Sequence, residues 1–297
     1  EPDAEGVWWH DFCTISRALI AESGVDPKAI EAVAPSGIGP CCLPVDEELR
    51  PLRKGILYGI DVRAAKEIEA LNAQIGPDAI LDRYGSPLTT QSAGAKILWI
   101  KNNEPDIYAR TAKFLTCSSY LAGKLTGVCS IDRYTAATFI PLYSIEDEDW
   151  EEDLRGICRR DQLADCYWTD EVVGTVHEQA ARESGLAVGT KVTAGTADAS
   201  AEGFSAGVTQ PGDMMIMYGS SIFIIHMVDK LVKDSRVWGS PYMFKGTNAI
   251  AAGMSCSGTL TRWFRDNFAV DIFERAEREG KNPYAEMMKL AEGVPAG

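Results

Sequence analysis

The segment Gly195–Ser221 reads GTADASAEGFSAGVTQPGDMMIMYGSS, and it decides the fold. Its first acid, Asp198, stands among small residues, after the β-branched pair Val192 and Thr193 and before a helix-permissive run. An acid at a strand-to-helix turn lies at the carboxyl end of a strand, where open α/β sheets place their ligands. Small neighbours also let a ligand approach closely. Asp198 is therefore a candidate functional acid, and the competing interpretation is a helix N-cap.

The second half of this segment contains an apolar strand that is interrupted by Gly219, Ser220 and Ser221. Glycine inside a strand often marks a tight turn or a close backbone approach. Amide and hydroxyl groups in such a turn can bind phosphate oxygens. The same residues also fit an ordinary hairpin turn, and short turn motifs often match by chance. Taken alone, this turn favours the hairpin interpretation.

Composition and charge restrict the class of protein. The chain has 297 residues, of which 45% are apolar and 24% are charged, as in a globular protein of two domains or one large α/β unit. Its 29 Lys and Arg against 43 Asp and Glu give a net charge of −14. Such a charge repels nucleic acid and anionic membrane surfaces, so neither is expected as a partner. An anionic ligand would need local N–H groups, a helix N-terminus or a metal.

Cysteine usage indicates a reducing compartment. Eight cysteines are scattered without a C-x-x-C pair, and only three histidines are present. This pattern predicts reduced, buried thiols in a cytoplasmic protein and argues against structural zinc. No apolar stretch reaches the length of a membrane span.

Strands and helices alternate along the first part of the chain. Helical spacing predicts a helix over Val7–Ser23 that ends at Gly24, and a second over Arg63–Ile75 with Asp61 as its N-cap. Two strands joined by a turn are expected between residues 41 and 59. The early sequence thus indicates a mixed α/β fold.

The middle and end of the chain continue this pattern. Residues 92–127 are expected to form a helical insertion, and the acidic run at 144–158 is expected to begin a helix. Met214, Met215 and Met217 fit a strand whose side chains fill a core. A further strand, NAIAAGM, and a helix, SGTLTRWFRDNF, follow.

Several motifs in this order resemble the FGGY family of carbohydrate kinases: APSGIG, ILYGIDVRA, GTADA followed by GDMMIMYGSS, and GMSCSGTLTRWFRDNF. The resemblance runs from about Trp8 to the end. It implies an α/β protein with the actin-like ATPase (ribonuclease H-like) fold, in two domains with a catalytic cleft. Residues 1–205 would be the sugar-binding N-terminal-type domain without its first strands. Residues 206–297 would begin the nucleotide-binding C-terminal-type domain, so both domains are expected to be incomplete.

The resemblance also implies roles for matching residues. It makes Asp198 the general base that takes the proton from the attacking sugar hydroxyl, a role that depends on positioning within hydrogen-bond reach. It places Gly219, Ser220 and Ser221 at the phosphates of ATP, and Gly258 beside the nucleotide. ATP and Mg²⁺ are the expected cofactors, and no residue is assigned to the metal.

Sugar contacts carry over to Gly37 and Ile38 in the turn at 36–39, and to Asp61 and Arg63. Xylulose kinases usually have a Gln-Met-His-like run after that glycine and Trp-Asn before the aspartate, where this chain has GIGPCC and YGID. The expected partner is a small sugar or polyol, with a ketopentose such as xylulose favoured. A homodimer is left open.

Two alternatives remain. The first is a non-catalytic fragment that binds a sugar or a nucleotide. It is favoured because the sequence lacks an Asp-x-Gly-Thr phosphate loop before Glu1 and a glycine-rich adenosine site beyond Gly297. A protein with these ends is expected to phosphorylate a sugar poorly. A hydrolase with paired carboxylates would need Asp61 as the mate of Asp198 and has the least support. Arg63 ranks above Arg133 as a candidate anion clamp.

Overall fold

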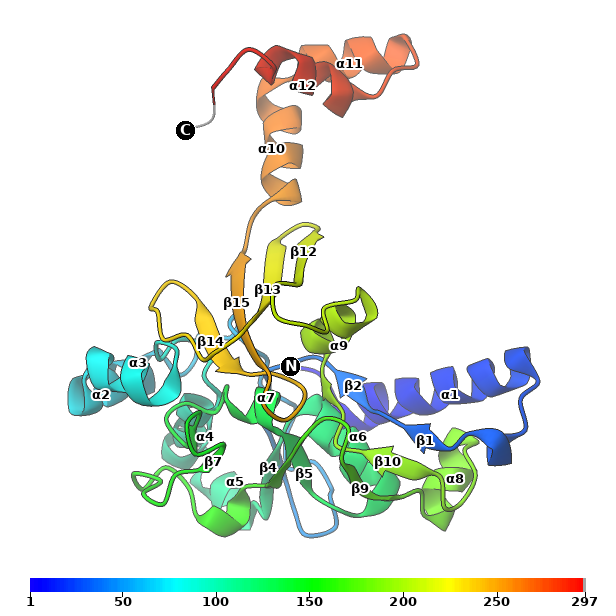
Figure 1. The fold of residues 1–297 in the computed structure, drawn as a ribbon, viewed down its shortest axis with the longest axis vertical. Coiled ribbons are helices and arrows are strands. Elements are labelled where there is room, and N and C mark those ends of the chain that lie inside the picture. Colours follow the sequence, from blue (N-terminus) through cyan, green and yellow to red (C-terminus); the bar gives the residue numbers. More distant parts are fainter. Residues whose placement is uncertain (296–297) are drawn as a thin grey trace. The chain divides into compact units, whose positions relative to one another are not determined.

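Short strands alternate with helices along the chain, as the sequence pattern predicts (Figure 1). The computed structural model describes residues 1–295. Contacts within the chain divide it into two compact units. Unit 1 comprises Glu1–Met214 and Ile225–Ala251, and unit 2 comprises Met215–Ile224 and the described residues from Ala252 onward.

Unit 1 holds most of the regular structure. Its helices are α1 (His10–Ser23), α2 (Ala65–Ile75), α3 (Pro77–Tyr84), α4 (Ala93–Asn103), α5 (Pro105–Arg110), α6 (Cys117–Thr126), α7 (Arg133–Ala136), α8 (Glu178–Ser184) and α9 (Asp198–Ser205). Its strands are β1 (Ala32–Val33), β2 (Ser36–Gly37), β3 (Leu43–Val45), β4 (Lys113–Leu115), β5 (Ser130–Asp132), β6 (Tyr143–Ser144), β7 (Asp149–Trp150), β8 (Asp165–Tyr167), β9 (Val172–Thr175), β10 (Lys191–Thr193), β11 (Thr196–Ala197) and β14 (Trp238–Pro241).

Three longer strands contain residues of both units: β12 (Met214–Tyr218), β13 (Ile222–Val228) and β15 (Asn248–Met254). With β14 they form one sheet in the order β12-β13-β15-β14. Unit 2 also contains the helices α10 (Gly258–Phe268), α11 (Val270–Arg278) and α12 (Pro283–Ala291), drawn in orange to red in Figure 1.

Sheet pairing in unit 1 brings the candidate acid to the candidate sugar turn. Strand β10 lies between β1, which is parallel to it, and β9, which is antiparallel. The next strand, β11, runs parallel to β2, with Thr196 opposite Ser36 and Ala197 opposite Gly37. Asp198 follows β11 directly, so this pairing sets Asp198 beside the segment 36–39. The predicted turn there is wrong for its first two residues, which form β2.

The core of unit 1 gathers the apolar side chains of α4, α6, β3 and β4 with a group of aromatic rings. Phe139 and Tyr143 each pack edge-on against Trp150, with ring centroids 5.5 and 5.6 Å apart. Trp8 and Trp9 are also buried. These aromatic rings make up a large part of the core of unit 1.

The first predicted helix is confirmed. A π-helical turn at Ala4–Trp9 leads into α1, which ends at Gly24 with a φ of +66°. The predicted N-cap of the next helix is wrong, because α2 is capped by Ala64 without a side-chain hydrogen bond. The carboxylate of Asp61 instead binds Arg63.

Two further expectations fail for local reasons. A second strand between residues 41 and 59 does not form; β3 pairs with β4, and the rest of that stretch makes only bridges such as Cys42 with Ile56. The acidic run at 144–158 contains β6 and β7 and no helix. Glu148 and Arg155 there have φ of +54° and +53°, which a right-handed helix excludes.

The insertion at 92–127 is helical at both ends, but β4 interrupts it. The predicted strands around residues 214–228 and 248–254 and the helix α10 are confirmed. The methionines of β12 do not fill a core, since Met214 and Met217 are 51% and 38% exposed. Strand β14 has no counterpart among the strands predicted from the sequence.

All eight cysteines are free, as predicted, but only half of them are buried. Three are half-buried and Cys256 is exposed. Among residues 1–295, no helix combines the length and the apolar character needed to span a bilayer.

Candidate functional site

Asp198 is the first residue of α9, and Ala197 is the N-cap, so the interpretation of Asp198 as the N-cap is wrong. Its half-buried carboxylate accepts a hydrogen bond from the amide of Ala199 at 2.9 Å. Burial raises the pKa of Asp198, opposed by the amides of Ala199 and Gly39 and reinforced by the charge of Glu202. A carboxylate with a raised pKa is a better proton acceptor than an exposed one.

Gly195 explains how the chain passes from β10 into β11 and so reaches this acid. Its φ is +69°, and a Cβ at this position would lie 1.9 Å from the carbonyl oxygen of Pro35. Only glycine meets both conditions without strain. The backbone can therefore turn from β10 into β11 while in contact with the segment that leads to β2.

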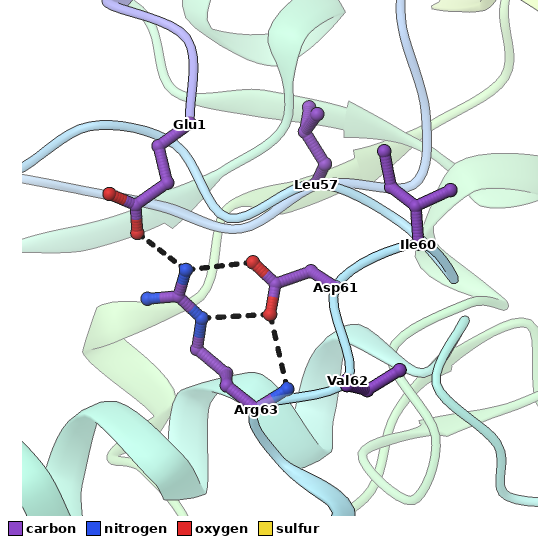
Figure 2. A pocket seen from close by; sticks show the side chains of 6 residues that line it. All are labelled: Glu1, Leu57, Ile60, Asp61, Val62 and Arg63. Atoms are coloured by element: carbon purple, nitrogen blue, oxygen red, sulfur yellow. Dashed lines mark hydrogen bonds and ion pairs between the residues drawn. The ribbon is translucent and has the colours of Figure 1, made fainter.

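A pocket of about 410 Å³ lies on the loop before α2 (Figure 2). It is lined by Glu1, Leu57, Ile60, Asp61, Val62 and Arg63. Figure 2 shows the Arg63 guanidinium between two carboxylates, with its Nη2 at 2.7 Å from Asp61 Oδ2 and 2.5 Å from Glu1 Oε1. The guanidinium also stacks over the ring of Trp99, 4.9 Å from the ring centroid.

The charges in this pocket suit a neutral, hydroxyl-rich ligand. Burial would raise the pKa of Asp61, but the hydrogen bonds from Arg63 outweigh that effect and lower it, so Asp61 is ionised near neutral pH. Glu1 also pairs with Arg53 at 2.5 Å, so the two carboxylates of the pocket are balanced by the guanidiniums of Arg63 and Arg53. Arg63 is thus engaged by acids and is not a free anion clamp, whereas carboxylate oxygens can accept hydrogen bonds from sugar hydroxyls.

Sequence reasoning missed Lys96, whose side chain is 1% exposed within α4. Its Nζ donates to the carbonyl of Leu57, which lines the pocket. Burial lowers the pKa of Lys96 to about 8, opposed chiefly by Cys42 and Asp61. One signal was present in the sequence, a single lysine inside the apolar run at 93–100.

The predicted sugar residues fall into two groups. Gly37 and Ile38 lie beside Asp198, and they are not among the residues that line the pocket of Asp61 and Arg63. The thiol of Cys41 lies within electrostatic reach of both Lys96 and Asp198. Lys96 in turn interacts with Asp61. Both groups thus lie within electrostatic reach of buried side chains of unit 1.

In unit 2 the structure brings Gly258 to the Gly-Ser-Ser turn. The amide of Gly258 donates to the carbonyl of Gly219 at 3.1 Å, and the amides of Ser257 and Thr259 donate to that of Ser220 at 2.9 and 3.4 Å. A Cβ on Gly258 would lie 2.6 Å from Gly219 O. Glycine is needed for this close approach.

The turn keeps polar groups for a ligand. Ser220 and Ser221 are exposed, and within the described part of the chain their hydroxyls make no hydrogen bond. Hydroxyl groups in such a turn can donate hydrogen bonds to phosphate oxygens. Among residues 1–295 no three His, Cys, Asp or Glu side chains form a metal cage. Mg²⁺ is usually held by one or two carboxylates, by waters and by nucleotide phosphates, so a Mg²⁺ ion that arrives with ATP does not require such a cage.

One protein family and several known proteins are similar to this chain. Residues 3–205 match the N-terminal domain of the FGGY family of carbohydrate kinases. The chain is 27% identical to an autoinducer-2 kinase of Yersinia enterocolitica over 298 residues, and 30% identical to one of Enterobacter sp. strain 638 over 313 residues. Each alignment covers 97% of this chain and 55% of the relative. The chain thus spans about half the length of the curated relatives it matches.

Solved structures show the same fold. A xylulose kinase from Rhodospirillum rubrum superposes on all of this chain, which covers 59% of that chain, with a TM-score of 0.89 and 27% identity. A Plasmodium falciparum glycerol kinase with ADP gives 0.80 at 18% identity, over 93% of this chain and 58% of that chain. The α/β fold is the actin-like ATPase fold that the sequence resemblance implied. Because the family match extends over more than half of its residues, the chain belongs to the FGGY family of carbohydrate kinases.

Proposed function

We propose that the chain takes part in the ATP-dependent phosphorylation of a sugar or polyol hydroxyl, with Asp198 as the general base. The main support is Asp198 itself, a half-buried carboxylate that directly follows strand β11 and lies beside the segment 36–39. The proposal includes a sugar-binding domain over residues 1–205 and the beginning of a nucleotide-binding domain over 206–297.

The chemistry assigned to these residues is simple. Asp198 accepts the proton of the sugar hydroxyl as the hydroxyl oxygen bonds to the γ-phosphorus and the bond to the bridging oxygen of ADP breaks. Gly219, Ser220 and Ser221 bind the terminal phosphates, and Gly258 lets α10 approach the turn. Mg²⁺ supplies charge neutralisation when it is bound with ATP.

The proposed substrate is a ketopentose such as xylulose. It is supported by the likeness to the Rhodospirillum rubrum xylulose kinase and by the pocket of Asp61 and Arg63, which suits hydroxyl groups. Gly37 and Ile38 would contact the same sugar. Because the related sequences are autoinducer-2 kinases, autoinducer-2 is the second substrate to test.

The test measures ADP release with ATP and Mg²⁺ against xylulose, ribulose, glycerol, gluconate and autoinducer-2. The chain is compared with Asp198→Asn and with Asp170→Asn, an exposed control in unit 1. We expect turnover that falls at least 100-fold in Asp198→Asn and stays within twofold in Asp170→Asn. Wild-type turnover in Asp198→Asn would exclude this base.

A calorimetric titration with the same compounds separates the main proposal from the alternative of a non-catalytic binding fragment. Binding of a sugar or of ATP without any turnover would favour that alternative. Binding of neither would contradict both.

A further inference from the structure

A buried carboxylate that the proposed reaction does not use lies behind the segment of Asp198. Asp132 ends β5, is 1% exposed and caps α7 through the amide of Thr135, which donates to Oδ2 at 3.1 Å. The same Oδ2 accepts a hydrogen bond from the hydroxyl of Thr196 at 3.0 Å. Asp132 therefore joins β5 and α7 to β11, two residues before Asp198.

The contact continues past Asp198 into α9. The hydroxyls of Thr196 and Ser200 lie 2.7 Å apart, and the Ser200 hydroxyl donates to the carbonyl of Ala197 at 2.9 Å. A continuous series of hydrogen bonds thus runs from Asp132 to the peptide unit between Ala197 and Asp198.

Counting protons shows why the charge of Asp132 matters. Three hydrogen-bond contacts connect Asp132 to Thr196, Thr196 to Ser200, and Ser200 to the carbonyl of Ala197. The two hydroxyls supply only two protons for these three contacts. With Asp132 ionised, Thr196 donates to it and Ser200 shares one proton between two acceptors. When Asp132 is protonated, its carboxyl group supplies a third proton, so each of the three contacts has a proton of its own. Burial raises the pKa of Asp132 to about 6, opposed by hydrogen bonds from Thr135 and Thr196.

The other charged or titratable groups near Asp132 do not compete near neutral pH. Tyr134 of α7 and Cys166 of β8 interact with it electrostatically, and burial raises the pKa of both, so both stay neutral. Arg133, which also interacts with Cys166, keeps its charge. Of Asp132, Tyr134 and Cys166, Asp132 is thus the one that can change its charge between pH 5 and 8.

We propose that Asp132 is a positioning residue for Asp198, acting through the hydroxyls of Thr196 and Ser200. The hydrogen bonds fix the carbonyl of Ala197 and with it the first turn of α9, so they set the direction of the Asp198 carboxylate. This inference rests on the proposed function only in taking Asp198 as the base. A misplacement of about 1 Å at a reacting group can cost about 100-fold in rate.

The first experiment does not require turnover. Thr196→Val removes one hydroxyl at nearly constant shape, and Thr193→Val is the matched control, since the buried Thr193 hydroxyl has no partner among the described residues. The carboxyl ¹³C signal of Asp198, assigned with Asp198→Asn, is titrated by NMR. We expect its midpoint to move by about 0.5 pH units in Thr196→Val and to stay unchanged in Thr193→Val.

The same signal tests Asp132 directly. In the wild type we expect a second inflection near pH 6 that reports Asp132, and we expect Asp132→Asn to abolish it. Asparagine still caps α7 and contacts Thr196, which separates loss of the charge from loss of the fold. An Asp198 titration that is identical in wild type, Thr196→Val and Asp132→Asn would overturn the inference.

Kinetics provide the second readout. With a sugar that turns over, Thr196→Val and Asp132→Ala should lower kcat by about 10-fold or more with less than a threefold change in the sugar KM, and Asp132→Asn should recover at least a third of kcat. Unchanged kcat in Thr196→Val would contradict the inference. If Asp198→Asn remains fully active while the NMR midpoint still moves in Thr196→Val, the proposed function fails and the positioning of Asp198 stands.

Discussion

The amide of Gly258 donates to the carbonyl of Gly219 at 3.1 Å, so the first turn of α10 and the Gly-Ser-Ser turn share one hydrogen-bonded junction. The junction lies wholly within unit 2. The first amides of α10 are therefore already engaged, and the phosphate-binding capacity proposed for this region rests on Ser220 and Ser221. The junction sets the direction of these two residues.

The first prediction concerns Gly258→Ala. Alanine inside a helix normally stabilises by up to about 1 kcal/mol relative to glycine. Here its Cβ would lie 2.6 Å from Gly219 O, so we expect a net loss of about 1–3 kcal/mol in the free energy of unfolding and weaker binding of ATP. Urea unfolding and calorimetry measure both quantities. Gly293→Ala, with open space around it, is the control and should change neither.

The second prediction concerns Lys96→Met. The ammonium group of Lys96 holds the carbonyl of Leu57, and a hydrogen bond to a charged group contributes about 1.5–3 kcal/mol. Its loss should loosen the pocket loop, whose Gly59 amide donates to Gln91 Oε1 and whose Asp61 amide donates to the carbonyl of Tyr58. We expect these two amides to exchange hydrogen about tenfold faster or more.

The matched control for this experiment is Lys66→Met, which removes an exposed lysine from α2. Its amide exchange in the loop should equal that of the wild type. Equal exchange in Lys96→Met and Lys66→Met would show that the loop does not depend on Lys96.

Local features of the site could be predicted from the sequence, whereas long-range contacts could not. The strand, the glycine and the start of α9 at Asp198 follow from neighbouring residues, so their order was predictable. Asp132 and Thr196 are 64 positions apart and meet only after folding. The N-cap expected at Asp61 failed because its carboxylate binds Arg63, a competition that a capping rule does not contain.

The third prediction concerns the pH dependence of stability. In the folded protein burial raises the pKa of Asp132 to about 6, above its unfolded value of about 3.9. The folded state therefore favours the protonated form. The stabilisation of the folded state by protonated Asp132 is fully present below about pH 4 and is lost as the pH rises through 6. At 1.36 kcal/mol for each pKa unit, the loss is about 3 kcal/mol.

Asp132→Asn cannot ionise and should escape this loss. We expect the free energy of unfolding of the wild type, relative to Asp132→Asn, to fall by about 3 kcal/mol between pH 4 and pH 7. Urea unfolding at a series of pH values measures this difference. Asp170→Asn, at an exposed position, should run parallel to the wild type. A pH-independent difference for Asp132→Asn would mean that Asp132 has an ordinary pKa in the folded state.

The fourth prediction separates two reasons for glycine before the proposed base. Gly195 and Gly189 both have positive φ, +69° and +89°, but only Gly195 has a close neighbour, the carbonyl oxygen of Pro35. Gly189→Ala should lower the free energy of unfolding by about 1–2 kcal/mol, because alanine disfavours this backbone conformation. Alanine at Gly195 adds a collision at 1.9 Å, so we expect at least a further 1–3 kcal/mol.

Urea unfolding of both variants measures this difference, and the Asp198 carboxyl ¹³C signal shows its consequence at the site. Because Gly195 directs the chain into β11, its variant should also displace that signal, whereas Gly189→Ala should leave it in place. Equal losses in the two variants would show that the approach to Pro35 relaxes at no cost. The turn at Gly195 would then position Asp198 by its backbone conformation alone.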